Sequence, residues 1–407
     1  MKKILSVVLA LAMVLSMCSF AMAETTGYDG TITIWVAEAV TGLTAELAEQ
    51  FKAEYPEYAN ITVNVEAVGE GDAASNMITD VEGGADIYGF AQDQLARLVA
   101  AGALETVEEN NAAIIAAEND AGAVAAATMG DTLYAYPMTS DNGYFLYYDS
   151  SVVTDPSTLE GIIADCEAAG KNFYMEIDSG WYITAFFFGT GCTLTYDSND
   201  EGALVACNST IASAEGVAAM KAMIALAKSS AFKNGSSAST ANDYAAIVDG
   251  TWDSSTVSSV LGDNYAAAKL PTFTVDGTTY QMGGFGGFKL MGIKPQVDDA
   301  KLACCDALAL YLTSEAAQMA RYDAVGWGPS NLVAQTSDAV KANPALAALA
   351  AQLNYCVPQG QYPGDYWTLA TALGDDIIAG NYNESTDEEL LAVLTTFEET
   401  CKSYAAN

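Results

Sequence analysis

Short β-strand patterns alternate with amphipathic helix patterns near the start of the chain. Strands are predicted at residues 31–36, 61–66 and 86–88, with helices at about 41–51 and 72–81 between them. This spacing is typical of a parallel sheet covered by helices. Ligands of such sheets bind beyond the carboxyl ends of the strands. The candidate site residues are therefore those that follow each strand, namely Glu38, residues 69–72 and residues 90–94.

The pattern after residue 131 indicates a second α/β region. Two strands, at 133–136 and 144–148, are predicted to be joined by a loop at 137–143, where the chain is expected to cross into that region. A glycine-rich run at 283–287 suits a second crossing, because glycine absorbs changes in backbone dihedral angles. It does not suit a dinucleotide-binding loop, since a strand rather than a helix follows it.

The length of the chain suits two domains, each with its own core, so we expect a two-lobed α/β fold. The predicted first lobe comprises residues 28–138 and about 285–326. The predicted second lobe comprises residues 143–280 and about 330–407. Hinges are expected near residues 138–143, 280–286 and 326–331.

The N-terminus predicts export. Lys2 and Lys3 precede an apolar run at 4–15, and Ala21 to Ala23 supply small residues for cleavage, which is the pattern of a secretory signal peptide at residues 1–23. The apolar run is too short for a membrane-spanning helix. Lipidation at Cys18 remains an alternative, so the mature protein is expected to be extracellular, periplasmic or anchored to the cell surface.

The charge balance excludes several classes of partner and chemistry. The chain has 15 Lys and Arg against 52 Asp and Glu, and loss of Lys2 and Lys3 with the signal changes the formal net charge from −37 to −39. Such a surface repels nucleic acid and anionic lipid. Histidine is absent, which excludes His-based catalytic triads and His-zinc sites. We expect no metal and no cofactor.

The cysteines allow one pairing to be predicted. Residues 193–196 and 203–206 flank a turn-rich segment and are predicted to form a hairpin, with Cys192 opposite Cys207. A disulfide between these two is one hypothesis, and buried free thiols are the alternative. The pairing of the others stays open, namely Cys166, Cys304, Cys305, Cys356 and Cys401.

The tryptophans are the strongest candidates for ligand contact. All five fall at predicted strand ends, helix starts or turns: Trp35, Trp181, Trp252, Trp327 and Trp367. Aromatic faces stack on the apolar faces of sugar rings, while carboxylates and amides bind the hydroxyls. Tyr182, Tyr366, Asp141 and Asn142 are candidate partners nearby in the sequence. Core packing is the alternative for each tryptophan, and Trp35 and Trp327 are as consistent with packing as with binding.

Catalysis is not expected. Two carboxylates facing one sugar could form a glycosidase pair, but the chain carries no glycosidase motif. Tyrosines could bind iron, but they lack the accompanying histidine, and the lysines or arginines that would hold a partner anion.

Several segments, in order along the chain, resemble one known family. They are residues 32–35, 86–93, 98–105, 136–149, 312–318 and 328–331. Together they resemble the family 1 extracellular solute-binding proteins of ABC importers, a family that includes the maltose/maltodextrin-binding proteins. The resemblance implies a type II-like periplasmic-binding-protein fold, in which each lobe is a mainly parallel sheet flanked by helices and the ligand cleft lies between the lobes.

The resemblance also implies roles for individual residues. It places Phe90 and Asp93 on the wall of the first lobe, with Gln94 where the maltose-binding relatives have an arginine. Asp141 or Asn142 would face the ligand from the first crossing.

In the second lobe, the resemblance places Trp181 and Tyr182 at an aromatic pair, with Trp252 and Trp367 at two further tryptophan positions. The family's Asp-Lys pair in the first loop is replaced by Ala39 and Val40, so Glu38 is expected to act there instead.

The expected function is capture of a carbohydrate, an oligosaccharide in particular, by hinge-bending closure, followed by delivery to a membrane permease. The protein is expected to be a monomer with no catalytic residues. A peptide, a polyamine or another small solute remains an alternative ligand, and a secreted carbohydrate-active enzyme is the alternative of another class.

Overall fold

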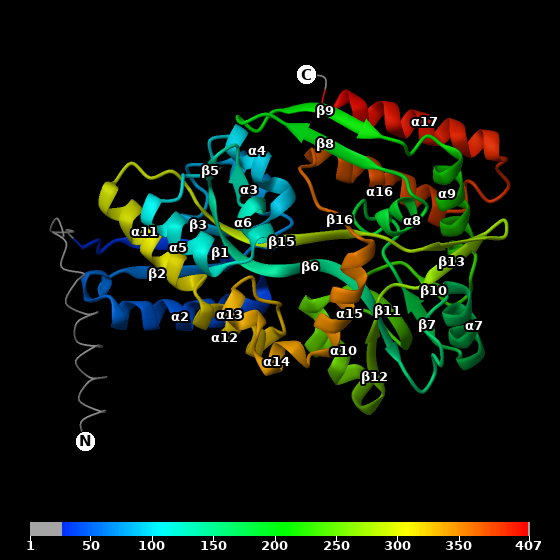
Figure 1. Ribbon diagram of the computed structural model, residues 1–407, viewed down its shortest axis with the longest axis horizontal. Helices are drawn as coiled ribbons and strands as arrows, with labels where there is room; N and C mark the ends of the chain where they lie inside the picture. Colours follow the sequence, from blue (N-terminus) through cyan, green and yellow to red (C-terminus); the bar gives the residue numbers. More distant parts are fainter. Residues whose placement is uncertain (1–26, 406–407) are drawn as a thin grey trace, which may run out of the picture.

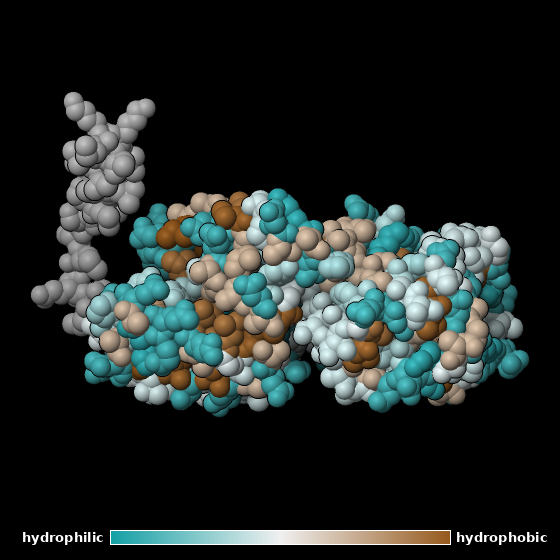
Figure 2. Space-filling model, turned by 90° about the horizontal axis from the view of Figure 1, so that it is seen from below, coloured by the Kyte–Doolittle hydropathy of each residue, from teal (hydrophilic) through white to brown (hydrophobic). Residues whose placement is uncertain are grey.

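The structure, a computed structural model, describes residues 27–405. The predicted signal peptide, residues 1–23, and the candidate lipidation site Cys18 lie outside the described residues. Two lobes lie side by side along the long axis of the molecule, with strands running through the middle (Figure 1). Figure 2 shows the surface indented between the two halves. Within residues 27–405, no helix has both the length and the apolar character needed to cross a membrane.

One mixed sheet extends through both lobes. Its main strands are ordered β10-β7-β11-β6-β15-β3-β1-β2, with β12 paired to β6 and β16 paired to β15. The bounds of these strands are β1 (Thr31–Val36), β2 (Thr62–Ala67), β3 (Ile87–Ala91), β6 (Ala135–Asp149), β7 (Asn172–Tyr174), β10 (Phe232–Lys233), β11 (Tyr244–Gly250), β12 (Tyr265–Ala268), β15 (Phe285–Ile293) and β16 (Val357–Pro358). Three small hairpins lie outside it: β4 (Thr128–Met129) with β5 (Thr132–Leu133), β8 (Leu194–Ser198) with β9 (Leu204–Ser209), and β13 (Thr272–Val275) with β14 (Thr278–Gln281).

Helices cover the sheet and join its strands. The α-helices are α2 (Thr41–Glu54), α3 (Ala73–Thr79), α4 (Leu95–Ala100), α5 (Glu109–Glu118), α6 (Ala121–Ala126), α7 (Leu159–Ala169), α8 (Thr184–Gly189), α9 (Ala214–Ala227), α10 (Ser254–Leu261), α11 (Asp299–Leu312), α12 (Glu315–Val325), α13 (Leu332–Gln335), α14 (Asp338–Lys341), α15 (Pro344–Gln352), α16 (Gly364–Ile378) and α17 (Asp387–Ser403). Short 3-10 helices follow several strands and helices: η1 (Glu38–Val40), η2 (Pro56–Tyr58), η3 (Gln92–Gln94), η4 (Thr251–Asp253), η5 (Gly262–Asn264) and η6 (Leu353–Tyr355).

The first lobe has the parallel strands that the sequence predicts. β1 lies between β2 and β3 and is parallel to both. Parallel neighbours need a crossover, which α2 and α3 supply. Alternate side chains of β1, those of Ile32, Ile34 and Val36, are fully buried, as expected for one face of a strand that packs on helices.

The second lobe is built around β7, β11 and β6. β7 is parallel to β10 and β11, whereas β11 is antiparallel to β6. The two-lobed α/β fold is therefore confirmed, with a sheet that mixes parallel and antiparallel pairs. Buried side chains form separate clusters at the two ends of this sheet. One contains Phe51, Ile87 and Leu308, and another contains Phe173, Phe186 and Met220.

Two long strands, β6 and β15, connect the lobes. They pair antiparallel from Ala135 opposite Gly292 to Gly143 opposite Gly286, with register shifts near Lys289. The predicted loop at 137–143 is wrong, because β6 runs through it without a break. Polar residues that suggested a turn are instead buried within the strand pair: Asp141 is 1% exposed and accepts hydrogen bonds from Thr251 and from the backbone of Gly328.

The hairpin of β8 and β9 forms with a different register from the predicted one. Tyr196 lies opposite Cys207, so Cys192 precedes the hairpin and does not face Cys207. In the observed turn, the Asn199 side chain accepts hydrogen bonds from the backbone of Glu201 and Ala203. The predicted disulfide is therefore wrong.

All seven cysteines in the described residues are free: Cys166, Cys192, Cys207, Cys304, Cys305, Cys356 and Cys401.

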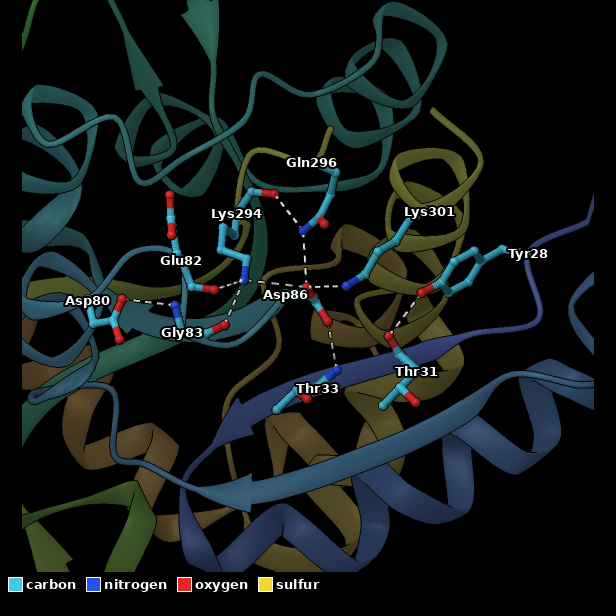
Figure 3. Close-up of polar contacts among 11 residues, drawn as sticks. Tyr28, Thr31, Thr33, Asp80, Glu82, Gly83, Asp86, Lys294, Gln296 and Lys301 are labelled. Atoms are coloured by element: carbon cyan, nitrogen blue, oxygen red, sulfur yellow. Dashed lines mark hydrogen bonds and ion pairs between the residues drawn. The ribbon is translucent and has the colours of Figure 1, made fainter. Parts of the chain in front are cut away.

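A buried carboxylate, that of Asp86, ties the edge of the first lobe together (Figure 3). Asp86 is 5% exposed, and its Oδ1 atom lies 2.7 Å from Lys301 Nζ and 3.6 Å from Lys294 Nζ. Gln296 Nε2 donates to the same oxygen, and the backbone of Thr33 donates to Oδ2. One side chain thus connects β3 with β1, with the segment after β15 and with α11.

Candidate ligand-binding site

A cavity of about 750 Å³ lies between the two lobes. From the first lobe it is lined mainly by residues that follow β1, β2 and β3: Ala37, Ala39, Gly69, Glu70, Gly71, Asp72, Ser75, Ala91, Asp93, Gln94 and Arg97. The remaining lining residues belong to the second lobe and the crossing segments: Asn142, Trp181, Tyr182, Trp252, Asp253, Lys289, Trp327, Gln359, Gly364 and Trp367. The cavity thus lies beyond the carboxyl ends of the parallel strands, which is where ligands of open α/β sheets bind.

The second-lobe wall of the cavity is aromatic. Trp181 and Trp252 lie with ring centroids 5.7 Å apart and ring planes at 44°. Trp181 is held from behind by Tyr144, whose hydroxyl donates to the Trp181 carbonyl at 3.0 Å. Trp367 lies in the first turn of α16, 4.9 Å from the Tyr366 ring. These rings offer apolar faces to a flat ligand group.

A buried ammonium group lies at the floor of the cavity. Lys289 is 5% exposed, and its Nζ atom lies 3.9 Å from the ring centroid of Trp327 and 5.1 Å from that of Trp252. Cation–π attraction to the two rings compensates part of the cost of burying the charge. Among residues 27–405, no oxygen atom lies within ion-pair or hydrogen-bond distance of this ammonium, so its three donors are free to meet a ligand.

Asp93 and Gln94 follow β3 on the opposite wall. The Gln94 side chain is used within the protein, because it accepts from the Ala74 backbone and donates to the Glu70 and Gly71 carbonyls. Asp93 Oδ1 accepts from Gln359 Nε2 at 2.9 Å. Burial raises the pKa of Asp93 to about 7, although the charge of Arg97 acts in the opposite direction.

The raised pKa of Asp93 has a consequence for stability. An unfolded aspartate titrates near 3.8, so between about pH 4 and pH 7 the folded protein holds a proton that the unfolded chain has lost. The contribution of Asp93 to stability therefore falls as pH rises through that window. We expect Asp93→Asn to raise the melting temperature, relative to the parent, more at pH 8 than at pH 4.5. Melting curves by circular dichroism at both values test this.

Asp263→Asn, at an exposed position, is the control for the Asp93 experiment. Its effect on the melting temperature should be small and the same at both pH values. An Asp93→Asn effect that does not change with pH would contradict the prediction.

Two further charged groups at the cavity have unpaired atoms. Neither Arg97 Nε nor Glu70 Oε1 has a hydrogen-bond partner in the described part of the chain. Burial lowers the pKa of Arg97. Buried polar atoms are normally satisfied by protein, water or ligand. The cavity therefore presents aromatic faces together with unfilled donors and acceptors.

The sequence-predicted residues divide into two groups. The structure brings Asp93, Gln94, Asn142, Trp181, Tyr182, Trp252 and Trp367 to the cavity. It does not bring Glu38, Phe90, Asp141 or Tyr366 to it.

The structure shows why these four residues do not line the cavity. Glu38 is exposed, and its neighbours Ala37 and Ala39 line the cavity instead. Phe90 is fully buried beside Tyr88 in the core of the first lobe. Asp141 binds Thr251 and Gly328, as described above.

Tyr366 lies just behind the cavity wall. It is 1% exposed, and its hydroxyl donates to the Gly180 carbonyl at 2.8 Å, next to Trp181. It supports the loop that carries a cavity residue without reaching the cavity itself.

Sequence reasoning missed Lys289, Arg97 and Gln359, and gave Trp327 no preference for the cavity. A lysine inside the apolar strand 288–293 was a usable signal, since lysine is rarely buried unless it is paired. Gln359 gives no such signal, because it lies between β16 and α16 in irregular structure. No group of three or more Cys, Asp or Glu side chains within residues 27–405 is arranged to hold a metal ion.

A family model described as bacterial extracellular solute-binding protein matches residues 46–348. No curated protein sequence gives a significant match.

Solved structures are similar over most of the chain. One, determined with acarbose, shares 26% identity at a TM-score of 0.79, covering 92% of this chain and 98% of that one. The ligand-free maltodextrin-binding protein of L. casei BL23 shares 22% identity at a TM-score of 0.74, covering 92% and 100%. The maltose/maltodextrin-binding domain from Bdellovibrio bacteriovorus, bound to maltotriose, shares 18% identity at 0.75, covering 91% and 99%. These similarities support the two-lobed fold.

Proposed function

Because this chain belongs to the bacterial extracellular solute-binding protein family, we propose that it captures an oligosaccharide in the cavity between its lobes and delivers it to the membrane permease of an ABC importer. The protein acts as a binding component and not as an enzyme. It works outside the cytoplasm as a monomer, after removal of residues 1–23.

The composition of the cavity wall is the observation that carries this proposal. Trp181, Trp252 and Trp367 supply ring faces of the kind that stack on sugar rings, and Lys289 and Glu70 supply unfilled hydrogen-bonding atoms suited to hydroxyl groups. The cavity volume of about 750 Å³ lies within the usual range for small-molecule sites. Two similar structures contain maltotriose and acarbose, which are carbohydrate-type ligands.

Closure of the lobes is the proposed mechanism. The first lobe comprises residues 28–138 and about 285–326, and the second comprises residues 143–280 and about 330–407. The lobes rotate about segments near 138–143, 280–286 and 326–331. A ligand that contacts both walls favours the closed form by the difference in its affinity for the two forms. The permease can then distinguish a loaded protein from an empty one.

A thermal-shift screen tests the cargo. Purified protein is heated with neutral oligosaccharides, oligouronates, peptides and polyamines, because a ligand that binds the native state raises the melting temperature. We expect the largest shift with an oligosaccharide. Polyamines are included because Glu70, Asp72, Asp93 and Asp253 line the cavity together with Lys289 and Arg97. A shift with peptides or polyamines alone would overturn the proposal, as would cleavage of an added oligosaccharide.

A further inference from the structure

One glutamine, Gln359, makes hydrogen bonds to residues on both walls of the cavity. It lies between β16 and α16 and is 2% exposed. Its Nε2 atom donates to Asp93 Oδ1 at 2.9 Å. Its Oε1 atom accepts from Trp181 Nε1 at 3.2 Å and from Asn142 Nδ2 at 3.4 Å. The three partners come from the first lobe, the second lobe and the strand that joins them.

The orientation of this amide follows from chemistry. The indole nitrogen of Trp181 can only donate a hydrogen bond, so the amide oxygen must face it. The amide nitrogen then points at Asp93, whose carboxylate is an acceptor. Reversing the amide would place two donors against each other at Trp181.

Backbone hydrogen bonds and close packing hold Gln359 in place. Its N–H donates to the Gly286 carbonyl at 2.9 Å, and its carbonyl accepts from the side chain of Gln92. Gly287 lies directly beneath, where an added Cβ atom would be 3.1 Å from both the Gln359 and the Gln92 side-chain oxygens. Gln359 also lines a second cavity of about 840 Å³.

We propose that Gln359 is a positioning residue for ligand recognition, which aligns the Asp93 carboxylate and the Trp181 ring so that both walls meet the ligand in the correct geometry. This rests on the proposed function for the identity of the ligand. The connection between the two walls does not depend on it, because all of these contacts are present in the protein alone.

The connection between Asp93 and Trp181 makes a distinctive prediction. The charged and titratable groups that face Asp93 are Arg97 on α4 and Tyr362 before α16. The amide of Gln359 is the hydrogen-bonded link between the Asp93 carboxyl group and the Trp181 indole nitrogen. Asp249, whose pKa burial also raises, faces Tyr182, which packs on the Trp181 ring, so its titration should persist in Gln359→Met. The Trp181 indole signal is expected to respond to pH with a midpoint near 7, the pKa of Asp93.

The first test uses the ligand-free protein labelled with ¹⁵N-tryptophan. The chain has five indole signals, and Trp181→Phe identifies the signal of Trp181. In the parent protein this signal should shift as pH rises from 5 to 9. In Gln359→Met, which keeps a side chain of similar size without the amide, the shift with a midpoint near 7 should disappear. An unchanged titration in Gln359→Met would overturn the proposal.

Gln361→Met is the matched control. Gln361 lies two residues later, and its amide accepts from the Ala96 backbone at 2.7 Å and donates to the Gln92 carbonyl at 3.0 Å. The substitution therefore removes two hydrogen bonds from the same segment without touching Asp93 or Trp181. The Trp181 titration should persist in this variant. Its loss in both variants would show a general disturbance of the segment and would overturn the specific role of Gln359.

The second test measures affinity for the saccharide found in the thermal-shift screen. Gln359→Met should weaken binding roughly tenfold, the effect of losing a well-formed hydrogen bond and its alignment, and Gln361→Met by less than about threefold. Equal losses in the two variants would contradict the proposal. If no saccharide binds the parent protein, the proposed function fails, while the ligand-free titration still decides the role of Gln359.

Gln359→Glu provides a second variant of nearly the same shape. Its carboxylate would face that of Asp93, and two such groups cannot both ionise without repulsion. Saccharide affinity of this variant should therefore fall as pH rises from 5 to 8, by more than in the parent. A pH profile identical to that of the parent would contradict the role assigned to Gln359.

Discussion

Asp86→Asn should lower the free energy of unfolding by about 3–5 kcal/mol, the cost of removing one partner from a buried ion pair. The substitution keeps the shape of the side chain but removes its charge. Lys294 and Lys301 would then be left as partly buried cations without a carboxylate, since both now contact Asp86 Oδ1. Urea denaturation followed by circular dichroism measures the change.

Asp276→Asn is the matched control for the Asp86 experiment. Asp276 pairs with Lys221, but its side chain is 72% exposed and that of Lys221 is 30% exposed. Exposed pairs contribute little because water and salt screen them, so the loss should be below about 1 kcal/mol. Similar losses in the two variants would show that the Asp86 network does not hold the first lobe together as its geometry indicates.

Trp181→Ala should weaken saccharide binding by about 1–3 kcal/mol, the scale of a lost aromatic contact at the centre of an interface. The ring forms the cavity wall together with Trp252, and its indole nitrogen donates to Gln359. Trp367→Ala should have a similar effect, since that ring lines the same cavity from α16. Isothermal titration calorimetry with the saccharide from the screen measures both.

Trp35→Ala controls for the general effect of removing a tryptophan. Trp35 lies on β1, and its Nε1 atom donates to Glu66 at the surface, away from the cavity. Its loss should leave affinity unchanged within about twofold. Unchanged affinity in both Trp181→Ala and Trp367→Ala would remove these residues from the ligand site.

Sequence patterns predicted those parts of the fold that depend on residues close together in the chain. The strand–helix–strand run from β1 to β3 was visible because its apolar residues follow the strand and helix periods. Trp181 and Trp252 were found because they are large aromatic residues outside the regular apolar periods: Trp252 follows β11, and Trp181 lies in the turns that lead from β7 to α8. In each case, the sequence pattern that supports the prediction lies within a few residues of the predicted element or side chain.

The remaining parts depend on partners that are distant in the sequence. Asp141 and Asn142 look like turn residues until β15 pairs alongside them. The hairpin that places Tyr196, and not Cys192, opposite Cys207 packs on α17, where Tyr196 bonds to Cys401 and Ser209 bonds to Glu398.

The cavity residues that were missed also depend on partners distant in the sequence. Gln359 acquires its role through Asp93 and Trp181, residues far from it in the chain and on opposite walls. Residue type and spacing carry little information about such contacts.

The position of β15 has a consequence for the order in which the protein can be completed. β15 lies between β6 and β3, so without it the sheet is two unconnected halves. A chain emerging from a ribosome or an export channel presents β1 to β3 first, then β6 to β11, and supplies β15 only later. Until then, β3 and β6 each keep an unpaired edge, a state prone to association with other chains. Folding of this protein therefore includes an interval, before residues 285–293 become available, in which the facing edges of β3 and β6 are open to other chains.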